Sequence, residues 1–228
     1  MRLNMGFFDA LFKKKKQEAG PSKPPIALSL ALSEIETFRT GRSFVISDTS
    51  QRESLLTRLE YEYSRKLPLF LIEYLTQSAP IESAYLDDVG NPICLFATTD
   101  LKYKQDGYNF DPRSQQAIEG WPEQYFIVAD RGGDPIAVDL TSLTGSVWIL
   151  EHGEGDWENR RQIADSVGQF LLCVFAQHHA LNEFERPAII DDAKGFNLSP
   201  LAAAWYFPRM QEWAGKHYKE WCHIFDDH

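Results

Sequence analysis

The middle of the chain constrains the fold most, because it predicts consecutive short strands joined by tight turns. Four segments of strand length lie here, rich in β-branched and aromatic residues: 92–97, 124–129, 136–140 and 146–150. Gly132 and Gly133 stand between the second and third segments, where adjacent glycines permit positive φ in a tight reversal. Thr144 and Gly145 precede the fourth segment. The pattern predicts an antiparallel meander.

Helical patterns lie on both sides of this meander. Before it, helices are predicted over residues 28–38, 50–63 and 66–77, although residues 27–33 (ALSLALS) also alternate with a period of two. After it, Ser166 and Gln169 have the spacing of a capping box, and Ser199 with Pro200 marks another helix start. Pro208 is predicted to break or restart that second helix. A final amphipathic helix is predicted from apolar positions at Met210, Trp213, Ala214, His217, Trp221 and Ile224.

Helices, then an antiparallel meander, then helices predict an α+β fold with helices packed on one sheet. A length of 228 residues suits one domain. We predict a tail with a proline-rich linker over residues 1–25 and a single domain over 26–228. In the tail, residues 5–16 (MGFFDALFKKKK) suit either a short membrane-surface or partner-docking helix or a frayed segment. Met5 is an alternative start to Met1.

Charge is unevenly placed along the chain. The net charge is −10, but residues 1–25 carry +4 and the remainder carries −14. An acidic body argues against a protein that binds nucleic acid, and suits either a basic protein partner or solubility alone. Three scattered cysteines, Cys94, Cys173 and Cys222, indicate no disulfide framework. With no secretory signal pattern at the N-terminus, we expect a cytoplasmic protein.

Common catalytic and metal-binding patterns are missing from the sequence. Residues 41–45 (GRSFV) lack the second glycine of a nucleophile elbow, and no phosphate-binding glycine loop occurs. His178 and His179 are adjacent, so on a helix they point about 100° apart and cannot easily share an ion. We expect no metal, no cofactor and no small-molecule substrate.

The most concentrated polar stretch is residues 151–158 (EHGEGDWE). Four acids surround His152 in the sequence: Glu151, Glu154, Asp156 and Glu158. The aromatic residue Trp157 stands among them. Three interpretations stay open: a catalytic or cation-binding carboxylate cluster, an acidic partner-binding loop anchored by Trp157, and a solvated loop whose Trp157 packs onto the core. Asp191 and Asp192 form a further acid pair, either partner-binding or a solvated turn.

Several passages, taken in order, resemble the SUKH superfamily of Smi/Knr-like proteins between about residues 60 and 180. Leu67 and Pro68, followed by Phe70, Ile72 and Leu75, are similar to the opening helix of that family. Residues 126–140 (FIVADRGGDPIAVDL) resemble its central hairpin. Residues 147–150 with His152 and Gly153, and residues 163–166 followed by Phe170 and Leu171, resemble its next strand, loop and helix entry. At the position before the glycines, members of the family often have a small or acidic residue, whereas this chain has Arg131.

The resemblance implies a bent sheet packed on helices and no catalysis. The residues that match its motifs are interpreted as fold-forming: Leu67, Pro68, Gly132, Gly133, Asp134, Asp139 and Ser166. Bacterial members of the family are mostly immunity proteins that neutralise polymorphic toxins, often nucleases or deaminases, and fungal members are scaffold-like regulators. Because fold alone does not fix function, three hypotheses remain.

The leading hypothesis is a non-catalytic immunity protein whose acidic body covers a basic nucleic-acid-binding cleft of a cognate toxin domain. The second is a regulatory or scaffold module, with residues 1–25 docking to a membrane or a protein. The third is a hydrolase that uses Glu151, His152 and Asp156.

Overall fold

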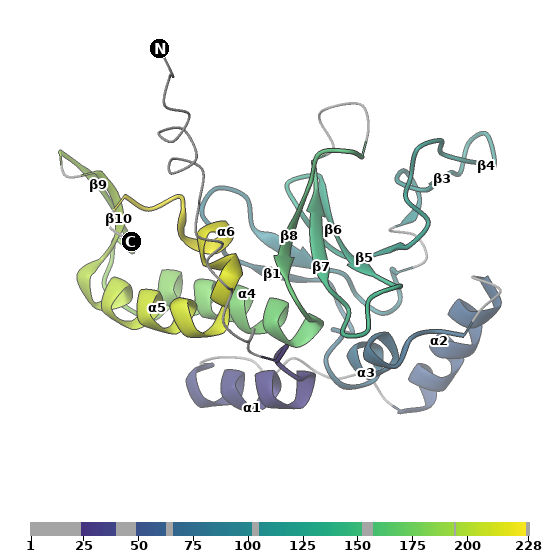
Figure 1. Cartoon of the computed structure of the whole chain (residues 1–228), viewed down its shortest axis with the longest axis horizontal. Coiled ribbons are helices and arrows are strands. Elements are labelled where there is room, and N and C mark those ends of the chain that lie inside the picture. The colour runs from purple at the N-terminus through teal and green to yellow at the C-terminus, as the bar shows by residue number, and fades with distance from the viewer. Residues whose placement is uncertain are drawn as a thin grey trace, which may run out of the picture.

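The sheet at the centre of the molecule has six strands, all antiparallel, in the order β1-β2-β5-β6-β7-β8 (Figure 1). The computed structural model describes residues 24–39, 49–62, 66–101, 105–151, 157–193 and 195–226. The strands are β1 (Ala84–Leu86), β2 (Ile93–Leu95), β5 (Tyr125–Arg131), β6 (Asp134–Asp139), β7 (Val147–Leu150) and β8 (Arg160–Ala164). The four predicted strands are confirmed. β1 and β8 were not predicted, because β1 is three residues long and β8 (RRQIA) is largely polar.

The turn between β5 and β6 is the tight reversal that the glycine pair predicts. Arg131 pairs in register with Asp134, which leaves a two-residue loop. Gly132 and Gly133 have φ values of 66° and 102° there, a combination that L side chains rarely adopt. A Cβ on Gly132 would also lie 2.4 Å from the Asn91 side-chain nitrogen. The positive φ therefore favours glycine at this position, and a side chain here would also force the exposed Asn91 side chain to move aside.

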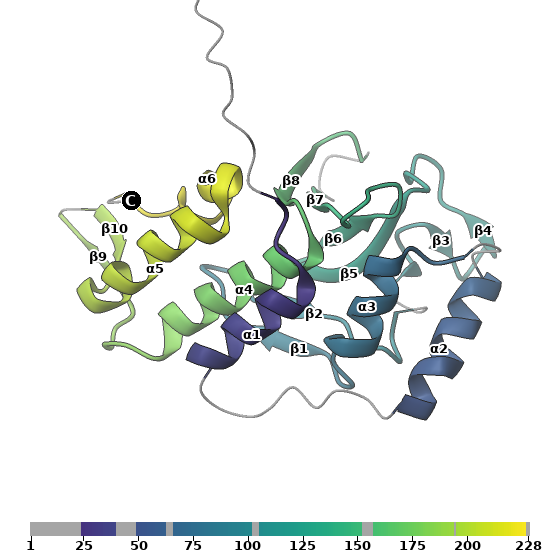
Figure 2. The same cartoon turned by 60° about the horizontal axis from the view of Figure 1, so that its bottom comes forward.

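One helix, α4 (Val167–Asn182), is buried along nearly its whole length. It packs against the sheet, and two further helices, α1 (Leu28–Phe38) and α5 (Pro200–Trp213), lie along it (Figure 2). The remaining helices are α2 (Thr49–Glu62), α3 (Leu69–Gln77), the short 3₁₀ turn η3 (Gly215–His217) and α6 (Tyr218–Cys222). The three predicted N-terminal helices are confirmed, with Pro68 standing at the N-cap of α3 instead of inside its first turn. One apolar cluster runs from Leu28 to Phe225.

The start of α4 shows how its predicted capping box is modified. The Ser166 hydroxyl accepts a hydrogen bond from the Gln169 amide at 3.1 Å, as the pattern predicts. The Gln169 side-chain oxygen, however, accepts from the Asp165 amide at 2.6 Å, one residue before the N-cap. Its side-chain nitrogen donates to the carbonyls of Trp213 and Ala214. Gln169 thus joins the start of α4 to the end of α5.

Two predictions about the C-terminal helices were wrong in detail. Pro208 lies inside α5 and does not break it. Proline has no amide hydrogen to donate to the Ala204 carbonyl, but both residues are exposed, so that carbonyl faces solvent instead of a dry core. The predicted final helix is divided between the end of α5, η3 and α6, and Ile224 is exposed.

The cap of α5 also differs from the prediction. Ser199 makes no capping bond, and its hydroxyl donates to the Glu185 carboxylate at 2.8 Å. That carboxylate accepts from the Leu201 amide at 3.2 Å, so Glu185 caps the helix in place of Ser199.

Two small hairpins lie at opposite ends of the molecule (Figure 1). The pair β3 (Phe110–Asp111) and β4 (Gln116–Ala117) is at the end that holds α2, and the pair β9 (Ile189–Asp192) and β10 (Gly195–Leu198) is beyond α5. Neither pair was predicted. Among the described residues, none of the helices is both long and apolar enough to cross a bilayer.

Candidate partner-binding surface

The acidic stretch begins at the base of a hairpin, where the structure gives Glu151 structural partners. Its amide donates to the Asn159 carbonyl at 3.0 Å, and its carboxylate accepts from the Asn159 side chain at 2.6 Å. The same carboxylate lies 3.5 Å from the Arg161 guanidinium, which also contacts Glu220 at 2.5 Å. Glu151 is therefore engaged in holding the base of the loop. Residues 152–156, and with them the predicted Glu154 and Asp156, lie outside the described residues.

Trp157 packs back onto the body of the protein. Its ring meets the edge of Trp121 with centroids 5.0 Å apart, and Tyr108 lies 6.1 Å from both rings. The three rings are called the aromatic cluster below. Trp157 is half-buried and contacts the core, as the third interpretation of this stretch predicts. The next residue, Glu158, is exposed.

An open cleft of about 520 Å³ lies beside the aromatic cluster. We call it the Trp121 cleft; the side chains that characterise it are Glu62, Asn109, Trp121, Glu123 and Tyr125. Glu62 is the last residue of α2, and Tyr125 is the first of β5. The cleft thus brings two carboxylates and two aromatic rings together from well-separated parts of the chain.

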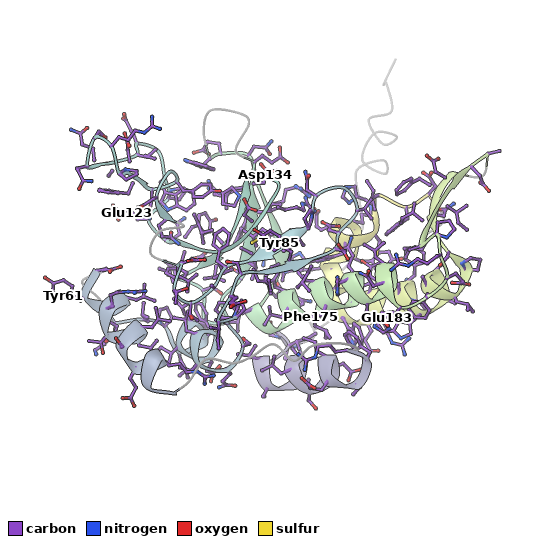
Figure 3. All side chains as sticks on the ribbon, turned by 180° about the vertical axis from the view of Figure 1, so that it is seen from behind. Tyr61, Tyr85, Glu123, Asp134, Phe175 and Glu183 are labelled. Carbon is purple, nitrogen blue, oxygen red and sulfur yellow. The ribbon has the colours of Figure 1, made fainter. Side chains whose placement is uncertain are left out.

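Exposed and cationic side chains lie at the same end of the molecule as this cleft. Tyr61, next to Glu62, is 84% exposed, and Figure 3 shows Tyr61 and Glu123 at the same end of the molecule. The Arg160 guanidinium lies 6.0 Å from the centre of the Tyr125 ring, within reach of a cation–π interaction. This end is consequently rich in tyrosine and tryptophan, the residue types that carry much of the energy at protein interfaces.

The aromatic cluster continues toward the acids of the β5–β6 hairpin. Burial raises the pKa of Tyr108 to about 12, and the charges of Asp130 and Asp134 add to the shift. Tyr85, on edge strand β1, is 70% exposed and lies opposite Cys94 in the sheet register, which in turn lies opposite Asp130. The pKa of Tyr85 is also raised, so both phenols stay neutral at physiological pH.

Arg131, the residue that departs from the family pattern, pairs with a buried carboxylate. Its guanidinium lies 3.3 Å from Asp88, whose side chain is only 5% exposed. Asp88 also accepts from the Gln177 side chain and from the Val89 amide at 2.6 Å. Burial raises the pKa of Asp88, and the Arg131 charge opposes that shift. Arg131 thus fixes the hairpin to the loop between β1 and β2.

The structure separates the other predicted partner-binding residues from this surface. Asp191 and Asp192 are exposed at the end of β9, at the opposite end of the molecule from the Trp121 cleft. Those of the seven predicted residues that the structure describes consequently do not form one contiguous surface.

The residues interpreted as fold-forming have local structural roles. Leu67 is buried, and Asp139 accepts two hydrogen bonds from Thr141 that close a turn after β6. Within the part of the chain that the structure describes, no group of three or more histidine, cysteine or acidic side chains could hold a metal ion.

The adjacent histidines face different surroundings. The His178 ring accepts from the Asp87 amide at 2.9 Å, whereas the His179 ring packs 4.5 Å from Trp205. Burial lowers the pKa of both rings.

Sequence reasoning identified Trp157 but missed Glu62, Trp121 and Glu123. The segment from 105 to 123 has no periodic pattern, and these acids are about sixty residues apart. The one local signal is Trp121 followed by Pro122, a large aromatic residue in a segment without regular structure.

Comparison with known protein families places the fold. The family model described as the SMI1 / KNR4 family (SUKH-1) matches residues 52–173, more than half of the chain. No match was found among curated proteins. The matched range runs from α2 to the middle of α4, so α1, α5 and α6 lie outside it. The chain therefore belongs to the SMI1/KNR4 (SUKH-1) family.

Proposed function

We propose that this protein is a non-catalytic immunity protein that binds and neutralises a cognate toxin domain of the nuclease or deaminase type. Family membership supports a protein partner, because bacterial members of this family are mostly immunity proteins. The observation that carries the proposal furthest is the Trp121 cleft, where carboxylates and aromatic rings gather on an acidic protein. Such a surface complements a basic protein and favours fast association with it.

A nuclease or deaminase domain binds a polyanion, so its active cleft carries positive charge. An acidic protein seated on that cleft would exclude the nucleic acid without performing chemistry. We place this interaction in the cytoplasm, and the three cysteines, which are buried and form no disulfide with one another, are compatible with a reducing compartment.

Co-expression tests this proposal. A cell that produces the toxin domain encoded beside this gene should survive when it also produces this chain, and the two proteins should co-purify. The control is an unrelated toxin domain of similar activity, which this chain should not neutralise. The proposal is wrong if the neighbouring toxin is neither bound nor neutralised, or if both toxins are rescued equally.

A further inference from the structure

We propose that the Trp121 cleft receives a lysine or arginine side chain of the partner protein, with the adjoining main chain, and forms the centre of the interface. This inference rests on the proposed function, because it assumes a basic protein partner. It adds the location of the contact and the kind of group that fills it.

An unpaired donor marks the wall of the cleft as incomplete in the free protein. The Trp121 side chain is more than nine-tenths buried, and its indole N–H has no hydrogen-bond partner. Buried tryptophan N–H groups normally find an acceptor, so an exception calls for an explanation. The nitrogen is covered in the free protein, so the ring would have to shift on binding for a main-chain carbonyl of the partner to supply the missing acceptor.

The carboxylates and rings of the cleft suit a cation. Glu62 and Glu123 place two carboxylates at it, and Trp121 and Tyr125 contribute aromatic rings. Glu62 also pairs with Arg58 at 3.8 Å, and Arg160 lies 6.0 Å from the centre of the Tyr125 ring, so a basic side chain of the partner would compete with these two arginines. Ammonium and guanidinium groups are attracted both to carboxylates and to the faces of such rings. A volume of about 520 Å³ exceeds what one long basic side chain needs and leaves room for its backbone.

The surroundings of the cleft have the composition of an interface centre. Tyr61, next to Glu62 on α2, is exposed, and the half-buried Trp157 of the aromatic cluster contacts Trp121. Rigid aromatic residues of this kind lose little conformational entropy on binding and supply most of the energy at interface centres.

Segments outside the family match cover two alternative surfaces. The backbone of edge strand β8 is covered by the C-terminal segment: His217 contacts the Gln162 carbonyl at 3.0 Å, and Trp221 donates to the Ile163 carbonyl at 2.9 Å. Helix α4 is covered by α1 and α5. A partner that approaches the family domain meets neither surface, whereas the Trp121 cleft is open.

Calorimetric titration of the full-length protein with the neighbouring toxin domain tests the cleft. We expect the double variant Glu62→Gln, Glu123→Gln to weaken binding by about 10- to 100-fold, the range for losing charged contacts at an interface centre. Trp121→Phe replaces the indole by a smaller phenyl ring. It removes the N–H together with part of the ring, and should weaken binding by at least about 5- to 10-fold, the worth of one hydrogen bond. Glu212→Gln, an exposed acid on α5, is the matched control and should stay within about twofold.

Thermal unfolding of each variant keeps the test interpretable. Trp121→Phe leaves a smaller ring at a buried position, so we expect the free variant to unfold at a lower temperature than the parent, and binding is compared well below that temperature. If the parent binds the toxin but the cleft variants bind like Glu212→Gln, the cleft proposal is overturned and the proposed function stands. If the parent forms no complex, the proposed function fails, and this inference fails with it.

Discussion

Asp88 shows at the scale of one residue how burial and pairing compete. Its carboxylate is almost fully covered, contacts Arg131 at 3.3 Å and accepts from Gln177. Removing a carboxylate from water disfavours its charged form, whereas the guanidinium favours it. Burial is the larger effect here, so the pKa of Asp88 is raised.

The raised pKa of Asp88 predicts how stability depends on pH. Because the folded state holds this proton more firmly than the unfolded state, Asp88 contributes most below its ordinary pKa of 3.8 and loses that contribution as pH rises through the folded pKa. We therefore expect the stability advantage of the parent over Asp88→Asn to shrink as pH rises through that window. Urea unfolding of both proteins across acidic pH measures it. An advantage that grows with pH would mean that the Arg131 pair outweighs burial.

Single residues also mark where sequence reasoning succeeded. The Gly132–Gly133 turn was predictable because adjacent glycines have few other uses between two strand-like segments. The partner of Glu185 was not, because a carboxylate that caps a helix 15 residues ahead in the chain leaves no local pattern. The Trp121 cleft was not predictable for the same reason, because its two acids come together only when α2 packs near the segment before β5.

Helix α4 holds the molecule together at the scale of elements. It lies between the sheet and the helices α1 and α5, which explains why it has no solvated face and only a weak helical periodicity in sequence. Its first turn approaches the segment before α1 closely. There the Ser166 hydroxyl donates to the Ile26 carbonyl at 2.6 Å, and a Cβ on Gly168 would lie 2.7 Å from the same oxygen.

Gly168→Ala tests this close approach. Alanine is the better helix former by about 1 kcal/mol, so the substitution would stabilise an unobstructed helix. Here the clash is with backbone atoms, which cannot rotate away, and overpacking of this kind costs about 1–3 kcal/mol. We expect a net loss of about 1 kcal/mol in the free energy of unfolding, measured in urea. A variant as stable as the parent would show that the segment before α1 does not pack as described.

Among the strands, those that are buried and apolar could be predicted from the sequence, and the polar edge strand β8 could not. β5, β6 and β7 are largely buried, and their apolar composition predicts them. β8 begins with three half-buried polar residues and is held partly by side chains of η3 and α6. A strand whose outer edge is closed by tertiary contacts carries little sign of them in its own sequence.

The whole molecule is acidic, with a net charge of −10, and the Trp121 cleft, lined by residues of α2 and β4 among others, lies at the end that holds these two elements. The two ends of the elongated fold differ, since Asp191 and Asp192 lie on the far hairpin. Partner binding at the cleft would leave that hairpin free.

Charge on this scale predicts a salt-dependent association rate. If the acidity steers a basic partner, raising the salt concentration from about 0.05 to 0.5 M should slow association about tenfold or more, because screening shortens the reach of the field. The dissociation rate should change much less. Stopped-flow mixing with the toxin domain separates the two rates. An association rate that is independent of salt would contradict this prediction and would indicate that the acidic charge serves solubility instead of partner binding.

The most direct test of the proposed function is a titration of toxin activity with the purified protein. We predict that inhibition rises linearly and is complete at about one chain per toxin domain, as tight binding over the active cleft requires. Undiminished nucleic-acid cleavage or deamination in a severalfold excess of this protein would contradict the proposed function.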